Sequence, residues 1–371
     1  MQKFIGRNAE SIDLNEVIAI LKSTNVIEPL TVEIKDNQGG NGNVLPGRLL
    51  AITVREKWSI FPVPFFSINS NGWAAGGAFM DTNAFGVKDT MMLVGSGGTS
   101  SWMANVMYIH SPNAIGGFGW NLMGMFLSQD KENIDQKDER VIRRFNSMTL
   151  NPSIGLSYKL TDLIVPSVSI GYKGVMLRDT EKPINAPGEG VQAISISPGI
   201  GIHNDTWDGY FLNGIDASLK YNYQLIIDND DVHSISLNAA LNRSIIPRLR
   251  FTAKTGIVFA TASSSPFFES SSINSGVNIL PQKYSAVDFA GISLGLERFL
   301  FKFSFGTVSV SAVYQAVYSH GELLHHQFDH GPAAMMQMYF SKVAFPGMGL
   351  GGAYNVDKNT WQYAFNVGMA F

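Results

Sequence analysis

The sequence alternates between bulky apolar residues and small or polar residues over many separate stretches. The last twelve residues, TWQYAFNVGMAF at 360–371, show this most clearly, since every odd-numbered position from Trp361 to Phe371 is apolar. Side chains of a β-strand point alternately to its two faces, so this stretch predicts a strand with one apolar and one small or polar face. The same period of two recurs at 153–160, 167–173, 194–203, 215–225 and 248–259.

These stretches follow one another without an intervening helical pattern, which predicts a single sheet. No run approaches the roughly 20 apolar residues of a membrane helix. A sheet that spans lipid must close on itself, because its edges would otherwise leave backbone groups unpaired. Short turns near residues 113, 161, 205, 246 and 345 alternate with longer polar links at 128–140, 178–190, 261–284 and 320–331. We therefore predict an antiparallel transmembrane β-barrel of about 16 strands, with 12 to 14 strands as the alternative.

Composition agrees with this fold and argues against several functions. Charged residues make up 15% of the chain, below the roughly 25% of an average soluble protein. The chain has no cysteine, which removes thiol chemistry, and its net charge of -3 gives no basic field for nucleic acid. Glycine loops that cradle phosphate, serine elbows and paired catalytic carboxylates are absent from the sequence. We expect a protein that is not an enzyme and needs no cofactor.

Residues 1–57 form a separate region. Leu14, Val17, Ile18 and Leu21 recur at helical spacing after Asp13, and strands are expected at 3–5, 30–36 and 48–57. This order predicts a small α+β module at 1–57, followed by the barrel at 58–371.

Several motifs carry a family resemblance. ITVREKWSIFPVPFF at 52–66 joins the module to the barrel, Asn83 and Gly86 lie in GGAFMDTNAFGVKDTMML at 76–93, and residues 291–321 read GISLGLERFLFKFSFGTVSVSAVYQAVYSHG. The chain resembles a minimal member of the BamA/TamA outer-membrane assembly superfamily, the bacterial surface antigen family. The resemblance implies that residues 1–57 are a reduced POTRA-like module in the periplasm. It also implies a start at MQKFIGR from which an export signal has been removed.

The C-terminal strand resembles the assembly signal of outer-membrane barrels. The residues that carry this resemblance are Trp361, Tyr363, Phe365 and Phe371. It implies that the strand is recognised by the outer-membrane assembly machinery, and that the apolar face meets membrane lipids.

The chain also departs from the family pattern. The sixth external loop of the family carries a Val-Arg-Gly-Phe-like tetrapeptide, but residues 261–284 contain no arginine. Ser319 or His320 replaces an aspartate of the family pattern. We therefore expect a porin-like or lipid-organising barrel that associates with copies of itself. The alternative is an outer-membrane protein insertion or secretion factor of the BamA type.

Two groups of polar residues are candidates for function. The first consists of cations expected to face the lumen, where they form ion pairs or a ring selective for anions: Lys159, Lys173, Lys220, Arg248, Arg250 and Lys254. The second is a histidine cluster with ligand types suited to zinc or copper: His320, His325, His326 and His330. Its spacing matches no defined zinc motif, so a polar external loop is the prediction and a metal site the alternative.

Overall fold

The structure is a computed structural model. It describes residues 8, 12–14, 17–18, 27–38, 44–56, 59–69, 72–112, 114–134, 141–181, 190–207, 211–227, 230–261, 278–280, 286–303, 306–320, 326–340 and 348–367. The chain divides into two compact units, one formed by Met1–Phe61 with Met80–Thr90 and the other by Pro62–Phe79 with Met91–Phe371. Among the described residues, no helix has the length and apolar character needed to cross a membrane.

In the first unit, a two-stranded antiparallel sheet pairs β1 (Ile27–Gln38) with β2 (Val44–Glu56). Leu14, Val17 and Ile18 are helical, and the Val17 N–H donates to the Asp13 carbonyl at 3.2 Å. Val17 is fully buried and packs against Ile12 and against Val32, Leu50 and Ile52 of the hairpin. Val17 therefore packs against the hairpin in the described part of this unit, and residues 3–5 and Leu21 lie outside that part.

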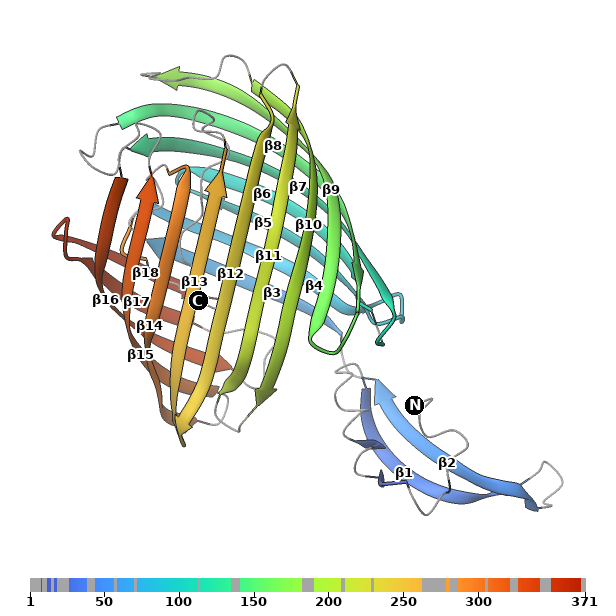
Figure 1. Ribbon diagram of the computed structural model, residues 1–371. Coiled ribbons are helices and arrows are strands. Elements are labelled where there is room, and N and C mark those ends of the chain that lie inside the picture. The colour runs from blue at the N-terminus through green and yellow to red at the C-terminus, as the bar shows by residue number, and fades with distance from the viewer. Residues whose placement is uncertain are drawn as a thin grey trace. The chain divides into compact units, whose positions relative to one another are not determined.

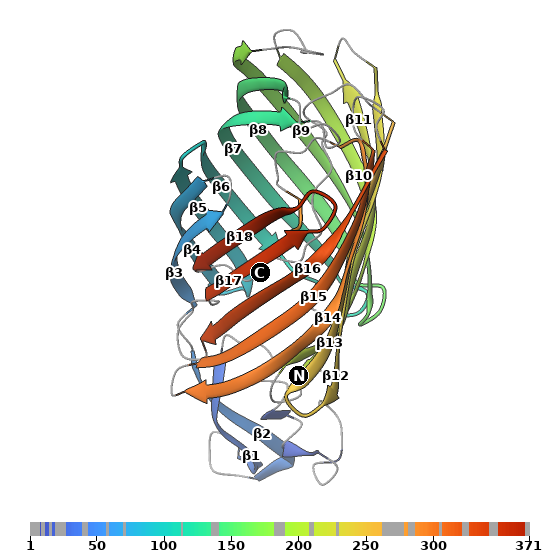
Figure 2. The same ribbon diagram turned by 90° about the vertical axis from the view of Figure 1, so that its left-hand side faces the viewer.

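The second sheet is a closed antiparallel barrel of 16 strands, β3 to β18, each paired with its neighbours along the chain and β18 with β3 (Figure 1, Figure 2). This confirms the predicted barrel and its strand number. The strands are β3 (Ile60–Asn69), β4 (Gly72–Ala84), β5 (Asp89–Gly98), β6 (Ser101–His110), β7 (Phe118–Ile134), β8 (Val141–Tyr158), β9 (Ile164–Glu181), β10 (Gly190–Trp207), β11 (Leu212–Ile226), β12 (Val232–Ile246), β13 (Leu249–Ala260), β14 (Asp288–Phe303), β15 (Gly306–His320), β16 (His326–Phe340), β17 (Met348–Asn355) and β18 (Thr360–Val367).

The strand register places apolar residues of neighbouring strands on the same face of the barrel. Ile154 pairs with Ile170, Leu219 with Leu237, and Met336 with Leu350, and all of these except Leu237 are exposed. The opposite face holds polar residues that are nearly inaccessible, such as Glu297 at 2% exposure. Only the inside of a barrel can cover a side chain in this way. The apolar face is therefore the outer face and the polar face is the inner face.

Odd-numbered and even-numbered strands run in opposite directions, which gives the barrel two different rims. One rim, the short-turn rim, carries the connections at 85–88, 111–117, 159–163 and 247–248. The other, the long-link rim, carries those at 135–140, 182–189, 261–287 and 321–325. Three sequence boundaries were wrong. β7 continues to Ile134, so most of the predicted link 128–140 is strand, and β16 begins at His326, so residues 326–331 of the predicted link 320–331 are strand. The turn expected near residue 205 begins only after Trp207. Polar residues there continue the ladder and make pairs such as Arg144–Glu132 between β8 and β7.

Candidate functional site

The barrel closes where its last strand meets its first strand, and we call this junction the seam. In the described residues, β18 pairs with β3 from Ala364–Asn69 to Val367–Phe66. On its other side, β18 pairs with β17 from Met348–Val367 to Asn355–Thr360. The seam therefore joins two strands from opposite ends of the barrel sequence, whereas every other pairing joins strands that follow one another along the chain.

A residue pair from the longest link between barrel strands, residues 261–287, lies against the inner wall of the barrel. Ile279 is fully buried and Leu280 is 8% exposed, although they belong to the Ser-rich link between β13 and β14. They cluster with apolar residues on the inner faces of β14 to β17: Phe289, Val313, Val317, Ala333, Met335 and Ala353. The Ile279 N–H also donates to Gln315 Oε1 at 3.0 Å. We call Ile279 and Leu280 the apolar latch.

The latch lies on a part of the inner wall that is closed to water. Gln315, Ser319, Asp329 and Asn355 are all fully buried on the inner faces of β15, β16 and β17. The Asn355 side-chain N–H donates to Asp329 Oδ1 at 3.0 Å, while Asp329 Oδ2 has no hydrogen-bond partner in the described residues. A water-filled channel would leave these side chains accessible, so this side of the lumen is filled.

The strongest ionic contact of the inner wall joins β13 to β14. Arg250 Nε and Nη2 donate to Glu297 Oε2 at 2.8 and 2.5 Å, and the Ser309 hydroxyl donates to Glu297 Oε1 at 2.5 Å. The guanidinium carbon of Arg250 lies 4.8 Å from the ring centre of Phe211, which is 4% exposed. A buried carboxylate with all these partners ties three strands and one short-turn connection into a rigid unit.

The other predicted lumenal cations occupy different places. By register, Lys173, Lys220 and Lys254 share the inner face with Arg250. Lys159 instead lies in the turn after β8, where its Nζ is 3.0 Å from Asp162 Oδ1. Arg248 lies in the turn before β13, with its guanidinium carbon 5.9 Å from the ring centre of Phe299. These six residues do not form one ring, because two of them lie at the short-turn rim.

The histidine candidates lie at the long-link rim on the outer face. His320 and His326 stack with ring centres 4.5 Å apart, and His320 Nδ1 is 3.3 Å from Asp288 Oδ2. The Tyr318 hydroxyl hydrogen-bonds His326 Nδ1 at 2.6 Å, and Tyr314 bonds His330 Nδ1 in the same way. No group of three or more metal-ligand side chains occurs in the part of the chain that the structure describes, and His325 lies outside that part. A metal site therefore gains no support from this geometry.

The outer face carries two aromatic bands, one at each rim. The histidines and their tyrosine partners belong to the band at the long-link rim. At the long-link rim, aromatic pairs include Tyr318–His326, Tyr221–His233, Tyr354–Trp361 and Trp102–Phe126. At the short-turn rim, Tyr108 stacks on Trp120 with ring centres 5.1 Å apart, and Phe118 contacts Tyr158. Aromatic girdles that flank an apolar band are typical of barrels that cross a bilayer.

The predicted assembly-signal residues lie in β18 where the structure describes them. Trp361 and Tyr363 are exposed at 69% and 56%, and Phe365 pairs with Leu350 on the outer face. Phe371 lies outside the described residues. The exposed aromatics give this strand an apolar outer surface, and its recognition by an assembly machinery stays a prediction.

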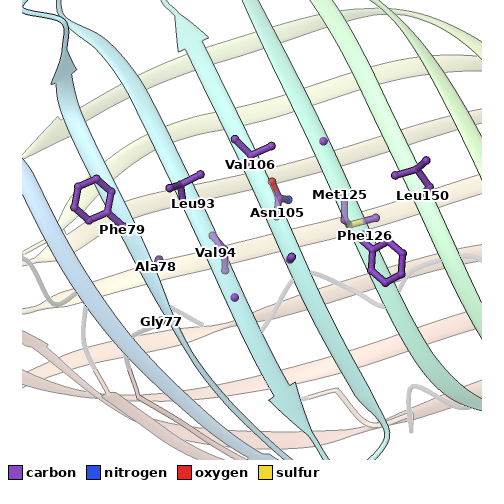
Figure 3. Close-up of a pocket in the computed structure, with 13 residues that line it drawn as sticks. Gly77, Ala78, Phe79, Leu93, Val94, Asn105, Val106, Met125, Phe126 and Leu150 are labelled. Atoms are coloured by element: carbon purple, nitrogen blue, oxygen red, sulfur yellow. The ribbon is translucent and has the colours of Figure 1, made fainter.

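The outer wall of β4 to β8 contains an open hollow of about 780 Å³ (Figure 3). Phe79, Leu93, Val106, Phe126 and Leu150 line it, and in Figure 3 they stand around it on neighbouring strands. The hollow exists because small residues occupy alternate outer positions between these side chains. The alternation pattern did not reveal it, since glycine and alanine were expected on the inner face.

Comparisons with known proteins support the fold. No protein-family model and no curated protein sequence matches this chain. Among solved structures, CdiB from Acinetobacter baumannii is similar with a TM-score of 0.65 and 11% identity, over 96% of this chain and 68% of that one. BamA from Haemophilus ducreyi lacking POTRA domains 1–3 gives 0.63 and 14%, over 95% and 78%. CdiB from Escherichia coli gives 0.63 and 14%, over 98% and 72%. The chain thus has the outer-membrane β-barrel fold of BamA and CdiB.

Sequence reasoning missed the latch. The only signal was one adjacent pair of bulky aliphatic residues in the stretch SSINSGVNILPQKYS, together with a glutamine at an inner position of β15. We expect Gln315→Leu to leave the Ile279 N–H without this acceptor and to weaken the latch by about 1–3 kcal/mol. Limited proteolysis of the protein in vesicles should then cut between residues 261 and 278 faster than in the wild type. Gln327→Leu, on the inner face of β16 and away from Ile279, is the control; equal cleavage of both variants would contradict this role of Gln315.

Proposed function

We propose that this protein is a non-enzymatic barrel of the bacterial outer membrane that inserts or secretes other proteins, using the seam between β3 and β18. The closure of the barrel by its first and last strands, β3 and β18, carries the proposal. A strand edge that is released from its partner exposes unpaired N–H and C=O groups, which can template a strand of a client protein. The fold shared with BamA and CdiB and the motifs at 52–66 and 76–93 support placing the chain in the outer-membrane assembly superfamily.

The filled inner wall favours a seam over a central pore. An open porin needs a water-filled lumen lined by accessible polar groups. Here the apolar latch and the buried residues Gln315, Asp329 and Asn355 occupy one side of the lumen. An apolar contact anchors the same link that lacks the family's arginine. The absence of this arginine is therefore a weaker argument against insertion activity.

The rims suggest the orientation in the membrane. Long links outside the cell and short turns in the periplasm are the rule for outer-membrane barrels. On this basis, residues 1–57 are a reduced POTRA-like module in the periplasm, and the two aromatic bands lie at the two lipid–water interfaces. Membrane lipids then contact the outer face, and β18 carries the signal for the assembly machinery.

The proposal is tested by locking the seam. Asn366 and Ser67 are paired across it, and the chain has no native cysteine, so Asn366→Cys with Ser67→Cys creates a single reducible link. The measurement is the folding rate of an unfolded barrel client offered to vesicles that contain the purified protein. We expect the reduced variant to accelerate folding above empty vesicles and the oxidised variant to lose this acceleration.

A matched pair far from the seam is the control. Ser195 and Gln224 are paired between β10 and β11 and also lie on the inner face. Ser195→Cys with Gln224→Cys should keep its activity when oxidised. Acceleration that survives the seam lock, or that is absent from the wild-type protein, would overturn the proposal.

A second candidate is a lipid-organising barrel that associates with copies of itself. The hollow in the outer wall of β4 to β8 favours a specific lipid contact, which this candidate requires. It predicts wild-type vesicles without client-folding activity but with oligomers on native gels, so the same preparation separates the two candidates.

A further inference from the structure

The residues at the bottom of the outer hollow have small side chains or none. Gly77, Gly95, Ala104 and Gly124 lie on β4, β5, β6 and β7, and all of them line the hollow. A Cβ added to Gly95 would meet no atom within 4 Å, so the space above this glycine is open. Three glycines and one alanine on four consecutive strands leave a furrow in the barrel wall.

The register places this furrow on the outer face. Val106 pairs with Gly124, Ala104 with Phe126, and Phe126 with Leu150. Leu150 and Val106 are 49% and 48% exposed. Leu150 continues the apolar face that includes Ile154 and runs around the barrel. The furrow therefore opens toward the surroundings of the barrel and not into its lumen.

Aromatic stacks on the strands of the furrow indicate the level of the furrow in the bilayer. Along β6, the furrow residues Ala104 and Val106 lie between Trp102 and Tyr108. Trp102 stacks on Phe126 with ring centres 4.7 Å apart, and Tyr108 stacks on Trp120 at the other rim. Because Trp and Tyr prefer the interfaces of a bilayer, the furrow lies at the level of the lipid tails.

We infer that this furrow binds one acyl chain of a membrane lipid. The inference rests only on the membrane-spanning part of the proposed function and not on the seam. The walls come from Phe79, Leu93 and Val106, whose exposed surfaces are apolar, so the ligand is a hydrocarbon and not a headgroup. A flexible chain can follow a furrow and fill it, which restores the dispersion contacts that an empty hollow lacks.

A second copy of the barrel fits this surface less well. A twofold contact whose axis passes through the hollow would place one hollow against the other and leave a larger void. A lipid chain needs no such symmetry and is always present in the membrane. The acyl chain is therefore the occupant that the shape favours.

The test fills the furrow without disturbing the sheet. Gly95→Leu places a side chain in the open space, and Gly97→Leu is its control, because Gly97 lies on the same face of β5, also has no atom within 4 Å of an added Cβ, and does not line the hollow. The probe is phosphatidylglycerol with a nitroxide at the middle of one acyl chain. Electron paramagnetic resonance of labelled vesicles measures the immobilised fraction, and native mass spectrometry counts the bound lipid.

We expect the wild type and Gly97→Leu to hold one immobilised lipid, and Gly95→Leu to bind it roughly tenfold more weakly. Each displaced methylene changes affinity by about fourfold, and a leucine displaces about two. If Gly95→Leu does not fold, as judged by heat-modifiable migration, Leu93→Ala removes a wall instead and should also weaken binding. Unchanged lipid binding in the folded variant, equal loss in both leucine variants, or a change of oligomer size without loss of lipid would overturn the inference. Client folding is not measured, so the seam proposal can fail independently.

Discussion

Replacing Glu297 by alanine is expected to lower the free energy of unfolding by about 3–5 kcal/mol, because it removes the carboxylate that neutralises a buried guanidinium. The side chains of Arg250 and Glu297 are only 14% and 3% exposed, and Arg250 Nη2 lies 2.5 Å from Glu297 Oε2. The Ser309 hydroxyl would lose its acceptor as well. The measurement is the urea midpoint of the barrel in detergent micelles, followed by tryptophan fluorescence.

A second ion pair of the same length gives the control for this prediction. Arg144 and Glu132 are also 2.5 Å apart, but their side chains are 46% and 30% exposed. Glu132→Ala should cost about 0–1 kcal/mol, because water already solvates this pair. Replacing both buried partners by apolar residues, Arg250→Met with Glu297→Leu, should recover most of the lost stability. Similar losses for Glu297→Ala and Glu132→Ala would mean that the inner wall is wet at this point.

Placing an arginine in the middle of the outer face is expected to have an effect of nearly the same size. Leu294 lies near the centre of β14, is 43% exposed, and pairs with Tyr314 and Ala253 on the outer face. Leu294→Arg should cost about 2–4 kcal/mol if the surroundings are hydrocarbon. The folded yield in vesicles, read as the heat-modifiable band on a gel, measures this cost.

The native sequence already contains an arginine on the outer face of β14, so the cost of an arginine there depends on its position along the strand. Arg298 lies exposed toward the short-turn end of β14, only four residues after Leu294. Phe301, which is 56% exposed near the end of the same strand, is therefore a matched control. Phe301→Arg should cost about 0–1 kcal/mol. If the two variants fold equally well, the outer face of β14 does not meet lipid.

The fold could be predicted from the sequence because a barrel repeats one local rule. Alternation fixes which residues face inward on each strand, and it placed Arg250 and Lys254 opposite Phe251 and Ile257, as the register has them. Turn lengths added the strand number. The ends of strands such as β7 could not be predicted. Polar residues continue the ladder there beyond the apolar band, and their sequence resembles that of a loop.

The candidate site was less accessible to sequence reasoning. The burial of Ile279 depends on contacts with β15, β16 and β17, which no local pattern encodes. The seam pairs β18 with β3, two strands that are separated by nearly the whole chain, so no local pattern encodes its register. The histidines were grouped along the sequence, but no local pattern predicts the tyrosine partners of His326 and His330 on the neighbouring strand.

The apolar latch also sets how the filled lumen responds to its surroundings. An arginine anchor would weaken as salt screens its charge, whereas the contact of Ile279 and Leu280 with Val313 and Val317 carries no charge to screen. Burial of hydrocarbon is driven largely by the entropy of water near room temperature, and this driving force fades on cooling. We therefore expect the docking of this link to withstand the screening of charge by salt and to weaken on cooling.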